Sequence, residues 1–326
     1  MAIWVSTRID PSGGREKSGN KEFSMTSKTK ERKKQISNPE KVFWPEERYT
    51  KLDLANFYRG VFSMLQPYVK DRILTLERCP DGLKGQCFYQ KEKPASMPPG
   101  TPTKRIENST GKRKATNYVV GGALETQLAL VNLGCIPVHV TGSRAKTFPK
   151  PDWVCFDLDP SSGQFSDAAE AGSLLKQALD GLSLKSFPKT SGSRGLHVFV
   201  PIRLGPVADE VLKFAEEVVS RLAAAHPKLV TTERSIAERA HRVYLDPFRN
   251  GSVQTVVTPY SVRRKPHAPV STPLDWSEVK PSLNPADFNL GNFQRRLTRK
   301  DPWADFFSSR QSLQAAMSRL RSFQKM

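Results

Sequence analysis

The chain has 326 residues, of which 37% are hydrophobic, so it is long enough to bury the core of one large domain or two small ones. Lys and Arg number 51 against 32 Asp and Glu, a net charge of +19, which predicts a polyanionic partner, most commonly nucleic acid. No apolar run approaches the ~18 residues of a membrane span, and the first residues lack a signal-peptide layout. We therefore expect no membrane partner and a cytoplasmic location; an excess of charge kept only for solubility stays open.

Residues 1–35 are rich in Lys, Ser, Gly and Thr and have almost no apolar period, which predicts a disordered basic tail. This tail has a net charge of +5, so the remaining residues keep +14. We expect a catalytic domain over residues 36–300 and a C-terminal helical extension over residues 301–326.

The four cysteines are Cys79, Cys87, Cys135 and Cys155, and they form no C-x-x-C pair. His241 and His267 lie near none of these cysteines in the sequence, so a mixed zinc site is not expected. We expect four reduced thiols of a cytosolic protein and no zinc site.

In chain order, apolar residues at helical spacing first predict a helix over Leu52–Leu65. Thr50 and Asp53 resemble a capping box, which would put Lys51 at the helix N-terminus. Residues 91–116 are Pro-rich and then basic, as in a surface loop or hairpin. The remaining patterns predict strands at Asn117–Val120, Ile136–Val140, Trp153–Leu158, Leu196–Ile202, Arg242–Asp246 and Val253–Val257, and helices at Ala123–Leu133, Ala168–Leu179 and Asp209–Ala225. Their irregular order favours an α+β fold with mixed or antiparallel sheets flanked by helices.

The run from Val154 to Pro160 carries two acids at alternate positions of a strand. Phe156 and Leu158 should face the core, and Asp157 and Asp159 the other side. Two such carboxylates repel each other unless a cation lies between them, and Mg²⁺ or Mn²⁺ prefers carboxylate oxygens. Asp246 ends another strand-like run, and three acids of this kind suit a two-metal site for phosphoryl transfer.

Two other interpretations of the acid pair remain. It could be two solvated acids at a strand end, or the Phe-Asp-Leu-Asp run could mark a phosphatase of the haloacid dehalogenase type with a nucleophilic Asp157. In those phosphatases the motif usually lies near the start of the chain and is followed by glycine, whereas here Pro160 follows.

Between two predicted strands lies a basic glycine loop, Lys189-Thr-Ser191-Gly-Ser-Arg194-Gly-Leu-His197. Its glycines permit a tight turn with exposed backbone N–H groups, which bind anions. Lys189, Ser191, Arg194 and His197 add donors of the phosphate-binding type. A plain hairpin is the alternative, but the upstream acid pair favours a site for a metal-bound triphosphate.

The order of these motifs, an acid pair, Ser-Gly-x-Arg-Gly-x-His and a third Asp, resembles that of the archaeo-eukaryotic primase superfamily. Further stretches are similar to the polymerase domain of bacterial DNA ligase D over residues 36–295. They include Arg78-x-Pro-Asp-Gly, Phe88-Tyr-Gln-Lys, Pro259-Tyr-Ser-Val-Arg263 and Val270-Ser-Thr-Pro-Leu274. The resemblance implies a primase-like catalytic core that adds nucleotides, ribonucleotides preferred, to DNA ends in non-homologous end joining. It also implies a Ku-like end-binding protein and a DNA ligase as partners, and DNA with 5′-phosphorylated ends or gaps as substrate.

The resemblance also implies roles for individual residues. Asp157, Asp159 and Asp246 match the ligands of two Mn²⁺ or Mg²⁺ ions. The residues implied to bind the NTP or dNTP, or to line its site, are Ser191, Arg194, His197, Arg263, Lys189, His139 and Arg239. Those implied to contact DNA are Asn38, Lys41 and Lys51 at a 5′-phosphate, Phe88 and Tyr89 stacked on template bases, and Arg78. Core burial is the alternative for the two aromatic residues.

The chain departs from the family pattern at Pro137, where Glu is common, and at Pro247, where an aromatic residue is usual. It also lacks the Lys-x-Asp-Gly of nucleotidyl-transferring ligases, so we expect that it does not seal nicks alone. Two other functions remain possible at this point: a primase that starts strands de novo, and a non-catalytic scaffold that binds DNA ends.

Overall fold

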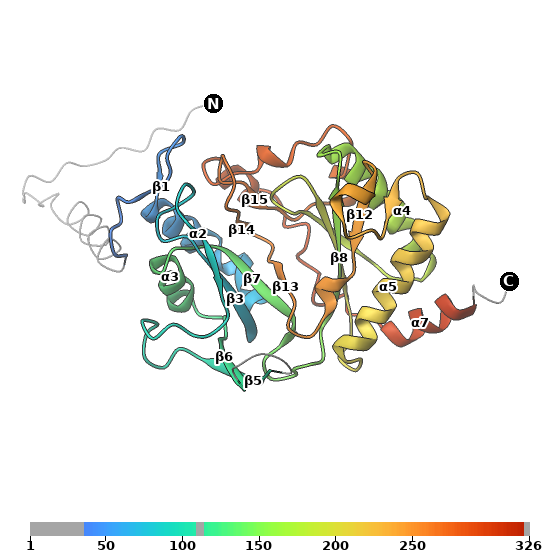
Figure 1. The fold of residues 1–326 in the computed structure, drawn as a ribbon, viewed down its shortest axis with the longest axis horizontal. Coiled ribbons are helices and arrows are strands. Elements are labelled where there is room, and N and C mark those ends of the chain that lie inside the picture. Colours follow the sequence, from blue (N-terminus) through green and yellow to red (C-terminus); the bar gives the residue numbers. More distant parts are fainter. Residues whose placement is uncertain (1–35, 109–113, 323–326) are drawn as a thin grey trace, which may run out of the picture.

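The computed structural model describes residues 36–108 and 114–322, so the predicted tail over residues 1–35 lies outside the described residues. Two sheets lie side by side, each with its own helices (Figure 1). The fold is α+β and almost wholly antiparallel, as predicted. None of the helices in the described ranges is both long and apolar enough to cross a membrane.

The first half of the molecule is built on a four-stranded sheet of order β13-β7-β3-β4. Its strands are β3 (Arg72–Arg78), β4 (Phe88–Gln90), β7 (Cys135–Arg144) and β13 (Thr255–Val257). Helices α2 (Lys51–Val69) and α3 (Leu124–Asn132) pack on it. Thr50 and Asp53 form the predicted capping box, and α2 begins at Lys51 because that box satisfies its first N–H groups.

Short ribbons surround this sheet: β1 (Val42–Trp44) with β2 (Tyr49–Thr50), β5 (Thr103–Glu107) with β6 (Ala115–Val119), and β14 (Ser261–Val262) with β15 (Val270–Ser271). The Pro-rich basic segment 91–116, expected to be a surface loop or a hairpin, contributes β5 and the start of β6, which pair antiparallel. β3 was not predicted at all, because it is buried on both faces and its apolar residues do not alternate with polar ones.

The second half contains a five-stranded sheet of order β11-β12-β8-β10-β9. Its strands are β8 (Trp153–Pro160), β9 (Phe187–Thr190), β10 (Leu196–Pro201), β11 (Val230–Thr231) and β12 (Val243–Asp246). Only the β11–β12 pair is parallel. Helices α4 (Phe165–Gly181) and α5 (Ala208–Ala225) cover one face of this sheet, and Phe156 and Leu158 are buried in the core between sheet and helices.

The opposite face of the five-stranded sheet turns toward the first half. There Trp153, Phe199 and Trp303 join the core of the four-stranded sheet. Asp157 and Asp159 belong to this second face, as the alternation predicted. The two sheets therefore meet along a partly aromatic seam, and the acids lie at the end of that seam.

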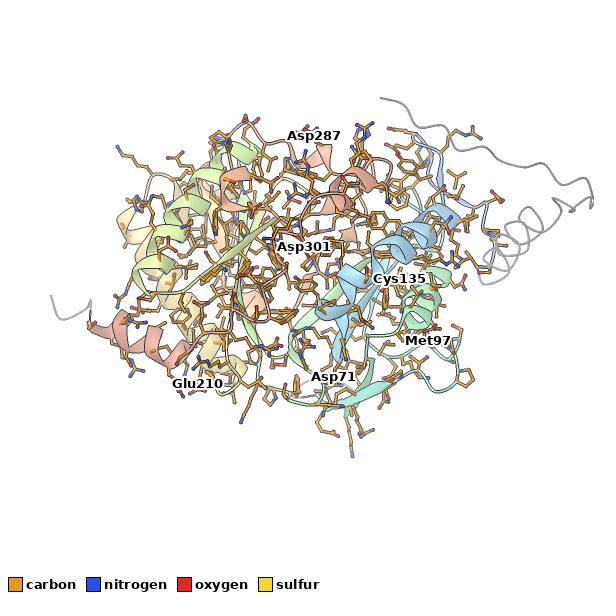
Figure 2. The ribbon with its side chains drawn as sticks, turned by 180° about the vertical axis from the view of Figure 1, so that it is seen from behind. Asp71, Met97, Cys135, Glu210, Asp287 and Asp301 are labelled. Carbon is orange, nitrogen blue, oxygen red and sulfur yellow. A yellow bond between two sulfur atoms is a disulfide. The ribbon has the colours of Figure 1, made fainter. Side chains whose placement is uncertain are left out.

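The segment beyond residue 300 contributes both a helix and core residues. Helices α6 (Gln294–Leu297) and α7 (Leu313–Ser322) follow the last strands, while Trp303 and Phe306 are fully buried and stack on each other. Seen from behind, Asp301 lies near the middle of the molecule (Figure 2). It accepts a 2.6 Å hydrogen bond from the Tyr260 hydroxyl. The assignment of residues 301–326 as a separate extension stays a prediction.

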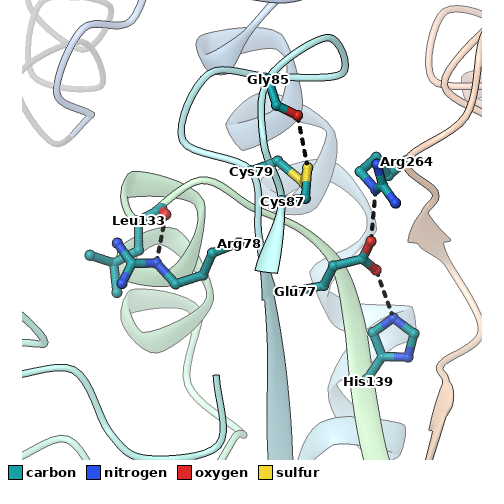
Figure 3. The surroundings of a disulfide bond; sticks show 8 residues. All are labelled: Glu77, Arg78, Cys79, Gly85, Cys87, Leu133, His139 and Arg264. Carbon is teal, nitrogen blue, oxygen red and sulfur yellow. Dashed lines mark hydrogen bonds and ion pairs between the residues drawn. A yellow bond between two sulfur atoms is a disulfide. The ribbon is translucent and has the colours of Figure 1, made fainter. Parts of the chain in front are cut away.

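One expectation about the cysteines was wrong. Cys79 and Cys87 are joined in a disulfide, with Cα atoms 4.4 Å apart (Figure 3), whereas Cys135 and Cys155 are free and buried. The reason is the register of β3 and β4, in which Arg78 is opposite Phe88. The next residues outward, Cys79 and Cys87, must then also face each other, which their spacing in the sequence does not reveal.

Candidate active site

Three acids gather on two neighbouring strands of the five-stranded sheet. Asp157 in β8 is directly opposite Asp246 in β12, and Asp159 is opposite Tyr244. Asp157 is 5% exposed and Asp246 9% exposed, and Asp159 is half-buried. Pro247 does not disturb this arrangement, because Asp246 still pairs with β8 before the chain turns.

The charges of these acids perturb one another. Burial alone would raise the pKa of Asp157, but the neighbouring His197 and Arg249 hold it well below its usual value. The negative charge of Asp157, with burial second, raises the pKa of Asp159 to about 7. Burial also raises the pKa of Asp246, which Arg249 opposes. Such repulsion between neighbouring carboxylates is typical of a site that binds a cation.

Arg249 lies among the acids, although no motif in the sequence pointed to it. Its Nε is 3.1 Å from Asp157 Oδ2 and 3.4 Å from Asp246 Oδ2. Arg249 follows Asp246 by three residues on the short 3₁₀ turn η2 (Phe248–Asn250). Asn250 holds that turn against β8. Its Oδ1 accepts a hydrogen bond from the Cys155 N–H, and its Nδ2 donates one to the Cys155 carbonyl.

The donors fit a divalent metal in chemistry. Within residues 36–108 and 114–322, no three His, Cys, Asp or Glu side chains are gathered as a formed metal site. However, Asp157 Oδ1 is buried and has no hydrogen-bond donor aligned with it. Carboxylate oxygens are what Mg²⁺ and Mn²⁺ prefer, and Asp157, Asp159 and Asp246 are the residues that would hold them.

The glycine loop closes against the acid strand. Gly192 has φ +70°, and a Cβ there would lie 2.5 Å from Arg263 Cγ. At Gly195 a Cβ would lie 2.4 Å from the Leu158 carbonyl oxygen, so only glycine allows this close approach to β8. Ser191 Oγ accepts from the N–H groups of Ser193 and Gly195 at 3.2 and 3.1 Å, which holds the loop in shape.

Two arginines border this loop. Arg263 donates to the Ser191 carbonyl at 2.7 Å, and burial lowers the pKa of Arg263 although Asp157 and Glu77 oppose the shift. Arg194 is exposed, and its guanidinium lies against Gly163, just beyond β8. Arg194 is therefore open to solvent, whereas Arg263 is tied to the backbone of the glycine loop.

Lys189, His197, Asp157 and Asp246 form one row across four strands. Lys189 is opposite His197, His197 is opposite Asp157, and Asp157 is opposite Asp246. The Lys189 ammonium is fully buried, 2.9 Å from His197 Nδ1, and His197 Nε2 lies 3.0 Å from Asp157 Oδ1. Burial lowers the pKa of Lys189 to about 7 and the pKa of His197 to about 4.

His139 belongs to the other sheet. It lies in β7, which continues past Pro137 although its register with β3 shifts between Cys135 and Val138, and its Nε2 is 3.3 Å from Glu77 Oε2 (Figure 3). Glu77 also accepts from Arg264 Nε at 2.8 Å. Burial would raise the pKa of Glu77, but these two partners lower it to about 2, and burial lowers the pKa of His139. Glu77 and Arg264 were missed because nothing in the sequence links β3 to residue 264.

Arg239 lies on the 3₁₀ turn η1 (Ile236–Arg239). Its charge is close enough to Asp159 to oppose the rise in the pKa of that acid. Its guanidinium covers the Tyr244 ring at 4.2 Å and donates to the carbonyls of Glu233 and Arg234. Arg239 is thus held at the border of the acid cluster by contacts with its own segment.

The residues expected at a 5′-phosphate meet at the start of α2. The exposed Asn38 accepts from the Lys41 N–H, and Lys41 Nζ pairs with Asp81 at 2.6 Å. Lys51 is only 5% exposed, and its ammonium donates to Ser37 Oγ and the Asn132 carbonyl. Burial, and the charge of Lys41, lower the pKa of Lys51. Of the two lysines, Lys41 is the one open to solvent.

Phe88 and Tyr89 lie on β4, at the edge of the four-stranded sheet. They are 44% and 66% exposed, so they are not core residues. Arg78 stacks over Phe88 at 5.3 Å and is fixed by bonds to the Leu133 carbonyl and Gln90. The Tyr89 ring meets His139 edge-on at 6.2 Å. Both rings keep a large exposed fraction despite these contacts.

Comparison with known proteins identifies the family of this chain. The family model for the LigD primase-polymerase domain matches residues 50–303. The chain is 31% identical over 284 residues to a bifunctional non-homologous end joining protein LigD of Bacillus subtilis, covering 86% of this chain and 45% of that protein. It is 30% identical over 288 residues to a multifunctional LigD of Pseudomonas aeruginosa, covering 87% and 34%. The chain thus spans less than half the length of these relatives.

A solved structure gives the same answer for the fold. The polymerase domain of Mycobacterium tuberculosis ligase D, in complex with DNA, superposes with a TM-score of 0.78 at 27% identity. The match covers 85% of this chain and 98% of that domain. The primase-like fold is therefore confirmed, and this chain belongs to the LigD primase-polymerase domain family, as a nucleotidyltransferase of the polymerase type.

Proposed function

We propose that the chain adds nucleotides, ribonucleotides in preference, to a primer 3′-hydroxyl at gaps or broken ends of DNA in non-homologous end joining. One observation carries this proposal: the three acids of β8 and β12 lie next to a glycine loop that Arg194 and Arg263 border. The acids would hold two divalent cations, and the loop and the arginines would hold the triphosphate. Bound cations would activate the hydroxyl and neutralise the leaving pyrophosphate.

The remaining steps fall to side chains of the chain itself. Arg194, Arg263 and the His197 Nε2–H would bind phosphate oxygens and stabilise the charge that develops there. Gly192 and Gly195 let the loop backbone approach β8 closely, which would bring the phosphates near the acids. Tyr89 and Phe88 would stack on template bases, and Lys41 would bind a 5′-phosphate.

The wider setting belongs to the same proposal. The names of the relatives associate them with non-homologous end joining, which supports a Ku-like end-binding protein and a DNA ligase as partners, and a bacterial cytoplasmic location. The net charge of +19 supports binding to DNA through phosphates, which would weaken steeply as salt rises.

Primer extension tests the proposal. A labelled primer would be extended across a short gap with a 5′-phosphate, in Mn²⁺ or Mg²⁺, with either NTPs or dNTPs. We expect extension that is lost in Asp157→Ala and retained in Asp209→Ala, an exposed acid at the start of α5. Comparing the extension rates with NTPs and with dNTPs gives the preference for ribose or deoxyribose.

The two other functions give different results in the same assay. Products on an unprimed template would indicate a primase that starts strands de novo. DNA binding without extension under either metal would instead favour the non-catalytic scaffold, and would contradict the proposal.

A further inference from the structure

The buried ammonium of Lys189 has a specific neighbour. Lys189 in β9 and His197 in β10 are directly opposite each other, so their side chains share one face of the sheet. Lys189 is 0% exposed and cannot reach water or a bound phosphate in this position. A buried charge is costly unless hydrogen bonds satisfy it, so its partners show what the charge is for.

The Lys189 ammonium has two polar contacts and one aromatic one. It lies 2.9 Å from His197 Nδ1 and 2.6 Å from Ser271 Oγ, above the Phe199 ring at 5.6 Å. Ser271 Oγ donates its own proton to the Thr190 carbonyl at 2.8 Å, so it can only accept from Lys189. An ammonium has donors alone, and the atom that faces it on His197 must therefore be a lone pair.

The other ring nitrogen faces the opposite kind of group. His197 Nε2 is 3.0 Å from Asp157 Oδ1, an oxygen that only accepts. That contact is not aligned as a hydrogen bond, since Asp157 Oδ1 has no aligned donor. The acid therefore favours a proton on Nε2 but holds the ring weakly, whereas the contact to Lys189 is short and enclosed.

We propose that Lys189 is a positioning residue, which donates to His197 Nδ1 from inside the core and so fixes the ring with its Nε2–H toward the acids and the nucleotide. The proposed function enters this role at one point only, the nucleotide that the Nε2–H would bind. The geometry gives Lys189 a role other than direct phosphate binding. A neutral imidazole held between a donor and an acceptor would meet each nucleotide in the same tautomer and orientation.

Nitrogen NMR of the full metal-free chain tests the role directly. Long-range ¹H–¹⁵N spectra of ¹⁵N-histidine protein distinguish Nε2–H, Nδ1–H and imidazolium, and the chain has only 5 histidines. His197→Asn assigns the ring by its missing signals. The spectra are recorded over a pH series, and the tautomer is determined where the imidazole signals are those of the neutral ring.

We expect the parent chain to show the Nε2–H form, with Nδ1 shifted as a hydrogen-bonded imine. Asp157→Asn should keep this tautomer, because Lys189 still donates to Nδ1. In the double variant Asp157→Asn with Lys189→Met, Nδ1 should lose its hydrogen bond and the two tautomers should both be present. Ser271→Ala, which removes the other contact of Lys189, should keep the parent pattern. An Nδ1–H form or an imidazolium in the parent, or loss of the tautomer in Asp157→Asn alone, would overturn the proposal.

The two proposals can fail separately. The spectra need neither DNA nor nucleotide, so a chain that extends no primer can still show the tautomer held by Lys189. In an active chain, Lys189→Met should lower kcat/KM by roughly 10-fold or more, as loss of a ring-orienting partner does. Lys185→Met, an exposed lysine of the same segment, is the matched control. Equal loss in both variants would contradict the positioning role, and the Asp157→Asn spectrum decides the matter if Lys189→Met does not fold.

Discussion

Arg249 Nε lies between two acids, 3.1 Å from Asp157 Oδ2 and 3.4 Å from Asp246 Oδ2. Arginine stays charged at any pH of interest, so it cannot leave these acids by losing a proton. A cation that uses the same oxygens must displace it. The internal charge that stabilises the acids in the free chain therefore competes with the metal.

Arg249→Gln should strengthen metal binding. If the half-exposed pair is worth about 1 kcal/mol, removing it corresponds to about a 5-fold lower Kd for Mn²⁺. Electron paramagnetic resonance of free Mn²⁺ measures this without substrate. Arg221→Gln, a surface arginine of α5 that pairs with Glu217, is the control. An unchanged or weaker affinity in Arg249→Gln would show that the arginine does not compete.

The 5′-phosphate site should respond in opposite directions to two substitutions. Lys41→Gln removes the solvent-open lysine and should reduce the preference for 5′-phosphate over 5′-hydroxyl ends several-fold. Asp81→Asn frees Lys41 from its 2.6 Å partner and should increase that preference, because an exposed pair holds its members only weakly. Anisotropy of labelled gapped DNA gives both ratios. If the two variants shift the ratio the same way, or not at all, Lys41 does not contact the phosphate.

The edge aromatics should matter for DNA and not for folding. Tyr89→Ala and Phe88→Ala should each weaken binding of a single-stranded template overhang by about 1–3 kcal/mol, the usual effect of losing base stacking. Both side chains are exposed, so we expect unfolding free energies to change by about 0.5 kcal/mol or less. Anisotropy and chemical denaturation provide the two numbers. A large loss of stability with unchanged DNA affinity would show that these residues support the fold and do not bind DNA.

Asp152 should dominate the stability of the seam between the sheets. It is 1% exposed and bonds Arg72, which is fully buried, as well as Arg144 and the more exposed Arg310. Asp152→Asn should cost about 3–5 kcal/mol of unfolding free energy, because it leaves a buried charge without its partner. Arg310→Gln should cost about 1 kcal/mol or less.

The same cluster sets a dependence on pH. Burial would raise the pKa of Asp152, but Arg72 and Arg144 lower it overall. The stability it contributes is therefore present above the unfolded pKa of about 3.9 and is lost as pH falls through the lower folded value. Denaturation series should show a steeper acid loss for the parent than for Asp152→Asn. Parallel curves would mean that Asp152 does not carry this linkage.

Local patterns determined much of this protein. The capping box at Thr50 and Asp53 positioned α2, because cap and first turn lie within four residues of each other. Strand alternation was enough to put Phe156 and Leu158 in the core, with Asp157 and Asp159 on the other face. The order of acids and glycine loop indicated the family, since these motifs are short and contiguous.

Contacts between distant segments were decided only by the tertiary structure. The Cys79–Cys87 disulfide depends on the register of β3 and β4, and the place of Arg249 depends on how Asn250 fastens a turn to β8. The row from Lys189 through His197 to Asp157 and Asp246 joins residues spread over 90 positions of the chain and exists because four strands are in one register. Register is set by the packing of whole sheets, which short motifs do not reveal. Lys189 was therefore predicted as a phosphate ligand from its sequence neighbours, although it lies buried beside the histidine it contacts.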